Sequence, residues 1–318
     1  MGNTRGTIHV DRPLSELSLK YKNGAMIADM ISPRIAVAKE SDKYFVYGKQ
    51  DFNVDDDYRA DKADPNWEDT WKIESTPTYV CEEHSRADLV SDRERENADA
   101  PLSPDIDTLE TLTNRLMLGR EKRLATILTA ATTYSSSSNT DTLSGTEQWN
   151  NASFNSDSLA DAIRVRIDTA KEAIRAYIGM DPNTIIIPAA VAKVVARDSE
   201  IKDYRKYTDP TLLINGDLPP QLWNMKVLVP GAIYNSANEG ATFSGADVWG
   251  KNVILAYIAP NPKTPKTMTF SLTFQSKPRQ VSKWREDRKK SDAIEVAEIL
   301  VEKVVSEYCG YLLKDVIA

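Results

Sequence analysis

The sequence predicts an α+β fold, and two features of its pattern lead to that class. Apolar residues recur at threes and fours between residues 103 and 133, as in one long amphipathic helix. Runs rich in β-branched and aromatic residues lie before this helix and again after residue 260. Between the helix and the later strands, residues 155–260 mix both patterns, which predicts an α/β subdomain inserted into the first one.

Length, charge and composition limit the class of function. The 318 residues are enough for about two subdomains at ~100–200 residues each. A formal net charge of −7 argues against a general nucleic-acid binder, although it leaves room for a local basic patch. Two cysteines form no disulfide framework, and no apolar run approaches the ~18 residues of a membrane span. The chain begins with no basic-then-apolar signal, so we expect a protein made and used in a reducing cytoplasm.

The first hundred residues predict an arm and a hairpin. Residues 1–43 are poorly periodic and are expected to form an arm that packs on another surface through a small apolar cluster at 26–31. β-prone runs at 44–47, 71–73 and 78–80 flank residues 51–69, which predicts a long hairpin. The flanked segment holds eight acidic residues against Arg59 and Lys62, a net charge of −6. Because two strands alone are marginally stable in water, this hairpin needs a further surface, on its own chain or on a neighbour.

The long helix has the expected start signals. Ser103 is a good N-cap, Pro104 suits the first helical position, and Asp105 and Asp107 complement the positive end of the helix. The polar residues 85–100 are expected to lead into it. The predicted apolar stripe consists of Ile106, Leu109, Leu112, Leu116, Leu124, Ile127, Leu128 and Ala131. The charged residues expected mostly off this stripe are Arg115, Arg120, Glu121, Lys122 and Arg123.

Residues 155–260 predict alternating helices and strands. A helix is expected from a cap at 155–157 to Gly179, with a stripe that includes Ile163, Ile167 and Ile174. Strands are predicted at 184–187, 225–229 and 253–258, short helices at 189–197 and 198–207, and a loop of small residues at 234–247.

The C-terminal part predicts a sheet that packs with the long helix. Residues 268–275 alternate apolar with polar, which predicts a half-exposed strand, and 281–287 continue as strand. Residues 293–305 fit helix or strand equally, and an apolar run at 311–317 closes the chain. Residues 277–290 carry seven basic residues against Glu286 and Asp287, a net charge of +5.

The search for catalytic and metal-binding motifs is negative. Gly245, Gly250 and Lys251 match most of a phosphate-binding loop, but Asn252 stands where a hydroxyl is needed and a strand pattern follows where a helix is needed. Cys81 and His84 supply only two ligands, too few for a zinc site. Asp55–Asp57 could attract a divalent ion, although a charge run is usually a solvated face. We therefore expect no enzyme, no cofactor and no metal, with nucleotide binding at 245–251 as a distant alternative.

The acidic hairpin and the basic strands have opposite charge and similar size. Within one chain they could simply meet, whereas between copies they would steer and orient assembly, more weakly as salt rises. A heterologous contact repeated with rotation closes rings or shells. The residues of this hypothetical inter-subunit contact are Asp51, Asp55, Asp56, Asp57, Asp61, Asp64, Lys277, Arg279, Lys283, Arg285 and Arg288.

Four stretches, in this order, carry a resemblance to a known family. They are residues 90–101 (VSDRERENADAP), 222–231 (LWNMKVLVPG), 248–257 (VWGKNVILAY) and 309–315 (CGYLLKD). The order of parts resembles the major capsid proteins of tailed bacteriophages, with the Hong-Kong-97-type shell fold. The resemblance implies an N-terminal arm (1–48), an extension-loop hairpin (49–84), a spine helix with the first part of the peripheral domain (85–154), an inserted axial domain (155–260) and a peripheral-domain sheet (261–318). It also implies that Gly250-Lys251 is a turn before an axial-domain strand.

The resemblance further implies a function without a catalytic centre. Such a protein self-assembles through hexamers and pentamers into an icosahedral shell around phage double-stranded DNA, which it contacts without sequence preference. The expected partners are further copies of the chain, a portal protein and a separate scaffolding protein, with no membrane. The expected location is the capsid of the virion, assembled in the bacterial host cytoplasm. The nearest alternative is an encapsulin-type compartment, which is similar in fold and encloses cargo enzymes.

Overall fold

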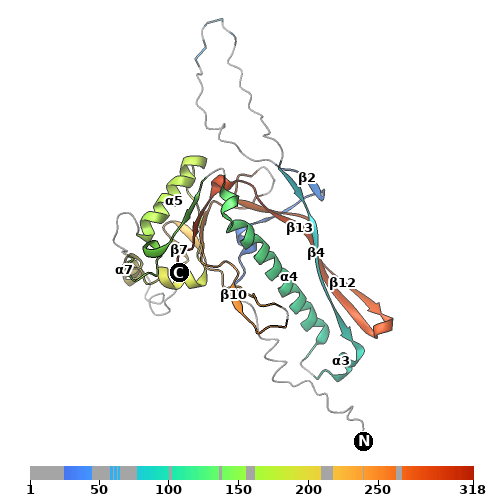
Figure 1. Ribbon diagram of the computed structural model, residues 1–318. Helices are drawn as coiled ribbons and strands as arrows, with labels where there is room; N and C mark the ends of the chain where they lie inside the picture. The colour runs from blue at the N-terminus through green and yellow to red at the C-terminus, as the bar shows by residue number, and fades with distance from the viewer. Residues whose placement is uncertain are drawn as a thin grey trace.

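The four-stranded sheet runs alongside one long helix, and a six-stranded sheet packs with the C-terminal part of that helix (Figure 1). The computed structural model describes residues 25–44, 58–59, 61–62, 64, 77–99, 102–135, 138–154, 162–208, 218–238, 240–262 and 267–318, with the backbone alone for 204–208. The long helix, α4, covers Pro104–Leu128, with a proline in its first turn as expected.

The first sheet has four strands in the order β1-β12-β13-β4. β1 runs parallel to β12, and the other pairs are antiparallel. Three of these strands form a long ribbon that extends away from the rest of the molecule (Figure 1). The bounds are β1 (Arg34–Ala36), β12 (Ser271–Glu286), β13 (Ser291–Val304) and β4 (Glu82–Ser91), with a 3₁₀ turn at Asp287–Lys289 and helix α3 (Asp92–Asn97) after β4. We call β12, β13 and β4 the ribbon.

The second sheet has six strands in the order β5-β14-β11-β6-β8-β7. All residues of β6 and β11 are buried, so these central strands form the middle of the largest core. The strands are β5 (Thr140–Thr142), β14 (Gly310–Lys314), β11 (Val253–Ala256), β6 (Thr184–Ile186), β8 (Met225–Leu228) and β7 (Gln221–Leu222). The helices that accompany them are α5 (Ile163–Ile178), α6 (Ala189–Val195) and α7 (Ser199–Thr208).

Smaller elements connect these parts. Two-stranded sheets pair β2 (Ser41–Lys43) with β3 (Thr78–Val80), and β9 (Ile233–Asn235) with β10 (Gly245–Asp247). A single-turn helix, α2 (Ala28–Ile31), precedes β1, and 3₁₀ turns cover Ala131–Tyr134, Gly145–Glu147 and Glu307–Cys309.

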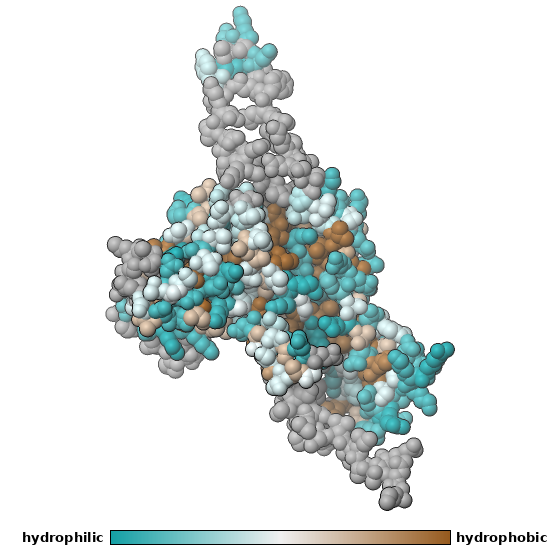
Figure 2. Space-filling view, in the orientation of Figure 1, coloured by the Kyte–Doolittle hydropathy of each residue, from teal (hydrophilic) through white to brown (hydrophobic). Residues whose placement is uncertain are grey.

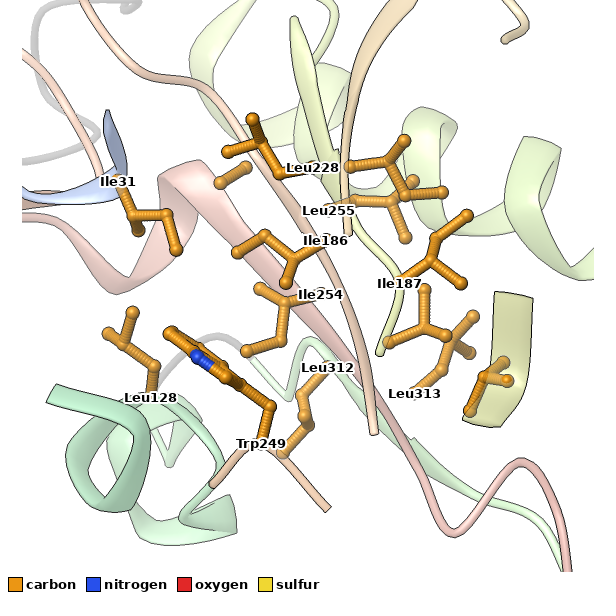
Figure 3. Close-up of a cluster of buried hydrophobic side chains, with 14 of the residues drawn as sticks. Ile31, Leu128, Ile186, Ile187, Leu228, Trp249, Ile254, Leu255, Leu312 and Leu313 are labelled. Carbon is orange, nitrogen blue, oxygen red and sulfur yellow. The ribbon is translucent and has the colours of Figure 1, made fainter. Parts of the chain in front are cut away.

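Helix α4 packs against different partners along its length. Leu112 and Leu116, in its first half, contact Val90, Ile294 and Val296 of the ribbon. Further along, Leu124, Ala125 and Leu128 belong to the core of the six-stranded sheet. Figure 3 shows this second core, where Leu128 lies near Trp249 and Ile31. One helix thus holds the two sheets together.

Several predicted elements are confirmed. The structure contains the long helix, a helix that ends at Gly179 in the left-handed region at φ 70°, two short helices after residue 188, and buried strands near 184, 225 and 253. The ambiguous segment 293–305 is strand, within β13. Gly250 has φ 61° in a turn that leads into β11, so the predicted turn before a strand is also confirmed.

Other predictions are wrong. Helix α4 ends at Leu128, and residues 131–134 form a separate 3₁₀ turn. Arg120 and Glu121, expected off the apolar stripe, are buried, whereas Ile106 on the stripe is exposed. The strand expected to be half-exposed is buried on both faces from 270 to 274, because the segment around Ser32 covers its polar side.

Three strand assignments are also corrected. Residues 85–91 belong to strand β4, and residues 234–247 contain the β9–β10 pair instead of a loop alone. The closing strand β14 pairs with β11 and β5 in the six-stranded sheet, not with β12 and β13. The expected domain boundaries themselves remain predictions. In the described part of the chain, no helix combines the length and apolar character needed to cross a bilayer.

Candidate subunit interface

The base of the expected hairpin is an antiparallel pair. Ser41 lies opposite Val80 and Lys43 opposite Thr78, on either side of the segment that is expected to form the hairpin. Tyr79 stacks on Phe274 of β12 with ring centroids 4.6 Å apart, and Tyr44 packs on the same ring at 5.5 Å. The described base of the expected hairpin therefore packs against Phe274 in the first part of β12. Asp51, Asp55, Asp56 and Asp57 lie outside the described residues, while Asp61 and Asp64 are described and exposed.

Lys283 and Arg285 of the basic segment pair with carboxylates of their own chain. Arg285 donates to both oxygens of Asp92 at 2.6 Å and to Asp292 at 3.1 Å. The ammonium of Lys283 lies 2.8 Å from Asp105 and 3.3 Å from Asp292. The guanidinium of Arg95 completes this group, 2.9 Å from Asp105 and 2.8 Å from Asp292.

We call these six residues the ribbon charge cluster. It joins α3, the first turn of α4 and strands β12 and β13, and its three cations balance its three anions. Hydrogen bonds from Arg285 lower the pKa of Asp92 and of Asp292, and the hydrogen bond from Lys283 lowers the pKa of Asp105. The cluster fixes the end of the ribbon to the start of α4.

The other basic residues divide into two groups. Arg279 is paired with Glu298 at 3.4 Å, and Arg34 contacts the same carboxylate at 3.1 Å. In the part of the chain that the structure describes, Lys277 and Arg288 have no ion pair and are exposed, as are Lys289 and Lys290. Figure 2 shows hydrophilic side chains at the free end of the ribbon. Of the predicted basic residues, Lys277 and Arg288 are therefore the ones open to a partner.

The sequence reasoning missed two apolar residues on the ribbon. Val281 is 54% exposed and Trp284 is 42% exposed, on opposite faces of β12. The indole N–H of Trp284 donates to Glu286 at 3.0 Å, which leaves the ring itself open. Their position inside a strongly basic run is the signal that could have identified them. They add apolar contact area to the charged end of the ribbon.

The sequence reasoning also missed a pair of buried charges, Arg120 and Glu121 in the middle of α4. Arg120 is 2% exposed and Glu121 is fully buried. Their partners come from α2, β12, β13 and the turn before β11. Two adjacent charges on a helix otherwise suggest a solvated face, so only the distant partners reveal the burial.

The candidate chemical motifs have structural roles in the described residues. Asn252, in the loop that resembles a phosphate-binding motif, accepts from the N–H of Asp315 at 3.1 Å and helps to hold the C-terminal strand. Burial raises the pKa of the Cys81 thiol, whose Sγ lies 3.5 Å from the carbonyl oxygen of Phe274, and burial lowers the pKa of His84. The described residues contain no group of three or more His, Cys, Asp or Glu side chains placed to hold a metal ion.

Comparison with known proteins gives the family context. No family model matches the chain. The chain is 27% identical over 315 residues to the major capsid protein of Burkholderia phage BcepMu, and the match covers 96% of each protein. It is 28% identical over 273 residues to the major capsid protein of Pseudomonas phage JBD67, covering 84% of this chain and 82% of that one. Phage major capsid proteins are homologues of this chain.

Solved structures show the same fold. A phage-related protein from Bordetella bronchiseptica RB50 superposes with a TM-score of 0.68 at 22% identity, covering 96% of this chain and 97% of that one. A chain from the capsid of cyanophage P-SCSP1u superposes with a TM-score of 0.63 at 8% identity, covering 92% and 89%. The protein therefore has the fold of phage capsid proteins, similar to the Hong-Kong-97-type shell fold. An encapsulin from Synechococcus elongatus PCC 7942 shares this fold, with a TM-score of 0.51 at 9% identity, covering 95% and 94%.

Proposed function

We propose that this protein is the major capsid protein of a tailed phage, which assembles with further copies of itself into a closed shell around double-stranded DNA. The observation that carries the proposal is the likeness to the BcepMu major capsid protein along 96% of both chains. The role is structural, so the surfaces that meet other copies take the place of an active site.

The shape of the molecule suggests how copies meet. The end of the ribbon extends from the body (Figure 1), and a hairpin built on the β2–β3 pair would add a second arm, so each could reach a neighbouring copy. A contact between the hairpin of one copy and the ribbon of the next is heterologous, and repeated rotation then closes rings of six or five copies. Such rings would be the hexamers and pentamers of an icosahedral shell.

Charge would orient this contact. The acidic segment 51–69 and the basic segment 277–290 attract, and exposed charges of this kind govern approach and register more than affinity. Lys277 and Arg288 are available from the start. Lys283 and Arg285 would first have to leave the ribbon charge cluster, so a contact through them would cost the pairing that they make with Asp92, Asp105 and Asp292.

The remaining partners follow from the proposed role. A portal protein and a separate scaffolding protein would act during assembly in the host cytoplasm, and the finished virion would hold DNA against the inner face of the shell. The net charge of −7 favours loose enclosure of DNA over tight binding, since tight binding needs many phosphate contacts from lysine and arginine.

An encapsulin-type compartment is the second candidate, because an encapsulin shares the fold over 95% of this chain. Both curated relatives are phage capsid proteins, which favours the phage role. The contents of purified particles separate the two: nuclease-protected DNA supports the phage role, and a co-purifying cargo enzyme supports the compartment.

Sedimentation velocity of the purified full-length chain tests whether it assembles at all. We expect fast-sedimenting shells or rings of several copies at low salt, with a smaller share at high salt because screening weakens the charge contact. A single monomeric species at every salt and protein concentration, with and without a scaffolding protein, would overturn the proposal.

A further inference from the structure

A buried joint lies where α4 passes from the ribbon to the six-stranded sheet. Leu112 and Leu116 contact the ribbon, and Leu124 and Leu128 contact the core of the larger sheet. Arg120 and Glu121 lie between these two groups, with 2% and 0% exposure. Buried charges are costly unless each is fully paired, so their presence at this position requires specific partners.

Arg120 holds the ribbon side of the joint. Its guanidinium donates to the hydroxyl of Thr273 in β12 at 3.1 Å and to the carbonyl oxygen of Ser32 at 3.2 Å. It also pairs with Asp29 and lies 3.7 Å from Glu302 in β13. These contacts bind the middle of α4 to β12, β13 and the N-terminal segment (residues 25–33).

Glu121 holds the other side. Its carboxylate accepts the indole N–H of Trp249 at 2.7 Å, the backbone N–H of Ala28 at 2.8 Å and that of Ile27 at 3.1 Å. Trp249 is in the turn before β11 and packs in the core of the six-stranded sheet, as Figure 3 shows. Arg120 thus connects α4 to the four-stranded sheet, and its neighbour Glu121 connects α4 to the six-stranded sheet.

The N-terminal segment crosses between the same two parts. The carbonyl oxygen of Ala25 accepts from the N–H of Gly231, in the chain that follows β8. Eight residues further on, the carbonyl oxygen of Pro33 accepts from the N–H of Thr273 in β12, and the carbonyl oxygen of Ile31 accepts from the hydroxyl of Ser271. Both ends of the segment are fixed, and Arg120 and Glu121 hold its middle.

We infer that Arg120, Glu121, Trp249 and the N-terminal segment form a joint that sets the angle between the ribbon and the six-stranded sheet. Its consequence for assembly rests on the proposed function. In a shell, the angle between the ribbon and the six-stranded sheet of each subunit sets the rotation from one copy to the next, and therefore the size at which the shell closes. The Trp249–Glu121 hydrogen bond is the link from these buried charges to the larger sheet, so Trp249 and Glu121 are positioning residues for assembly.

The chain supplies a matched pair of variants. Trp249→Phe removes the indole N–H that Glu121 accepts. Trp149→Phe is the control, because Trp149 is also buried, at 4% exposure, in the same core, and its indole N–H has no acceptor in the described part of the protein. Both changes remove similar volume, and only the first removes the bond. Glu121→Gln serves as a second test variant that preserves side-chain volume.

The test measures the joint before assembly and its effect afterwards. Spin labels on introduced cysteines at Gln280 of the ribbon and Glu172 of α5, both exposed, report the distance between the two parts in the full-length chain by pulsed electron resonance. We expect a narrow distance distribution in the parent and in Trp149→Phe, and a broadened one in Trp249→Phe and Glu121→Gln. Electron micrographs should then show a wider spread of particle diameters for the same two variants.

Equal distance distributions in Trp249→Phe and Trp149→Phe would overturn the inference. If both stay narrow, the Trp249–Glu121 bond does not set the angle. If both broaden, the effect comes from the lost side-chain volume and not from the lost hydrogen bond. If the parent chain forms no particles at all, the proposed function fails, while the distance measurement still decides the joint.

Discussion

At the scale of single residues, the structure depends on a few polar side chains whose partners are far away in sequence. Glu121 accepts from backbone groups 94 and 93 positions away and from an indole 128 positions away. The sequence pattern around residue 121 predicts a solvated helix face, because periodicity reports only near neighbours. Buried charges of this kind are therefore the part of the structure that a single sequence does not reveal.

Glu121→Ala should destabilise the folded subunit strongly. Three buried donors would lose their acceptor, and each unsatisfied buried group costs about 1–3 kcal/mol, so we expect a loss of at least ~3 kcal/mol in the free energy of unfolding. Urea unfolding followed by circular dichroism measures it. Glu110→Ala, at an exposed position of the same helix, should stay within about 0.5 kcal/mol of the parent; equal losses for both would contradict the role of Glu121.

The ribbon charge cluster should loosen in acid. The pKa values of Asp92, Asp105 and Asp292 are lower in the folded state than in the unfolded chain, where an aspartate has a pKa near 4. These ionised carboxylates therefore stabilise the fold fully at a pH above the unfolded pKa. That stabilisation is lost as the pH falls through the lower pKa of the folded state. Hydrogen exchange of residues 283–292 should therefore show less protection, relative to the intrinsic rates, at pH 3 than at pH 6.

Arg285→Gln tests the cause of these shifts. Arg285 is the first cause of the lowered pKa of Asp92 and Asp292, so its loss should raise both values toward the ordinary aspartate range. NMR titration of the carboxyl carbons measures this directly. Unchanged values for both carboxyl groups would show that Arg285 does not hold them in solution.

At the scale of elements, local pattern was a good guide wherever one face of an element is buried. Helix α5 was predicted from its apolar spacing and its final glycine, and β11 from a short run of apolar residues. Strand β4 escaped prediction because most of its residues are exposed and pairing with β13 alone makes it a strand. The polar side of β12 looked solvated because Ser32, which covers it, is 241 positions away.

Leu116→Pro should abolish the fold. Leu116 is in the interior of α4 and 4% exposed, and an interior proline removes a helical hydrogen bond and costs about 3 kcal/mol or more. We expect an insoluble or unfolded chain by circular dichroism. Asn114→Ala, on the exposed side of the same turn, should fold normally; a soluble proline variant that assembles would mean that α4 is not continuous.

At the scale of the whole molecule, assembly is expected to depend on opposite charges carried by different copies. Replacing Asp55, Asp56 and Asp57 with Lys should leave the subunit folded and block or reduce shell formation, because the hairpin would then repel the basic end of the ribbon. Particle yield by sedimentation, with circular dichroism as the check on folding, measures this.

A second charge reversal is the matched control for that variant. Changing Lys277, Arg288 and Lys289 to Asp in the same chain restores opposite signs and should recover part of the particle yield. Undiminished shells from the first variant, or no recovery in the combined one, would count against the paired contact.

The fold class and the capsid resemblance were predictable from the sequence, because the order of arm, hairpin, long helix and inserted subdomain is a pattern of whole elements. The contact residues remain a prediction, since such contacts form between copies and the decisive part of the hairpin lies outside the described residues. Trp249 shows the limit well: the turn and strand that follow it were predicted, but its hydrogen bond to Glu121 was not.

Cryo-electron microscopy of particles formed by the purified protein tests the central claim most directly. The account predicts closed shells in which this fold repeats at every position of the wall, with residues 51–69 of one copy against residues 277–290 of the next. Failure to form any closed particle or ring, at low and high salt and with a scaffolding protein present, would contradict it.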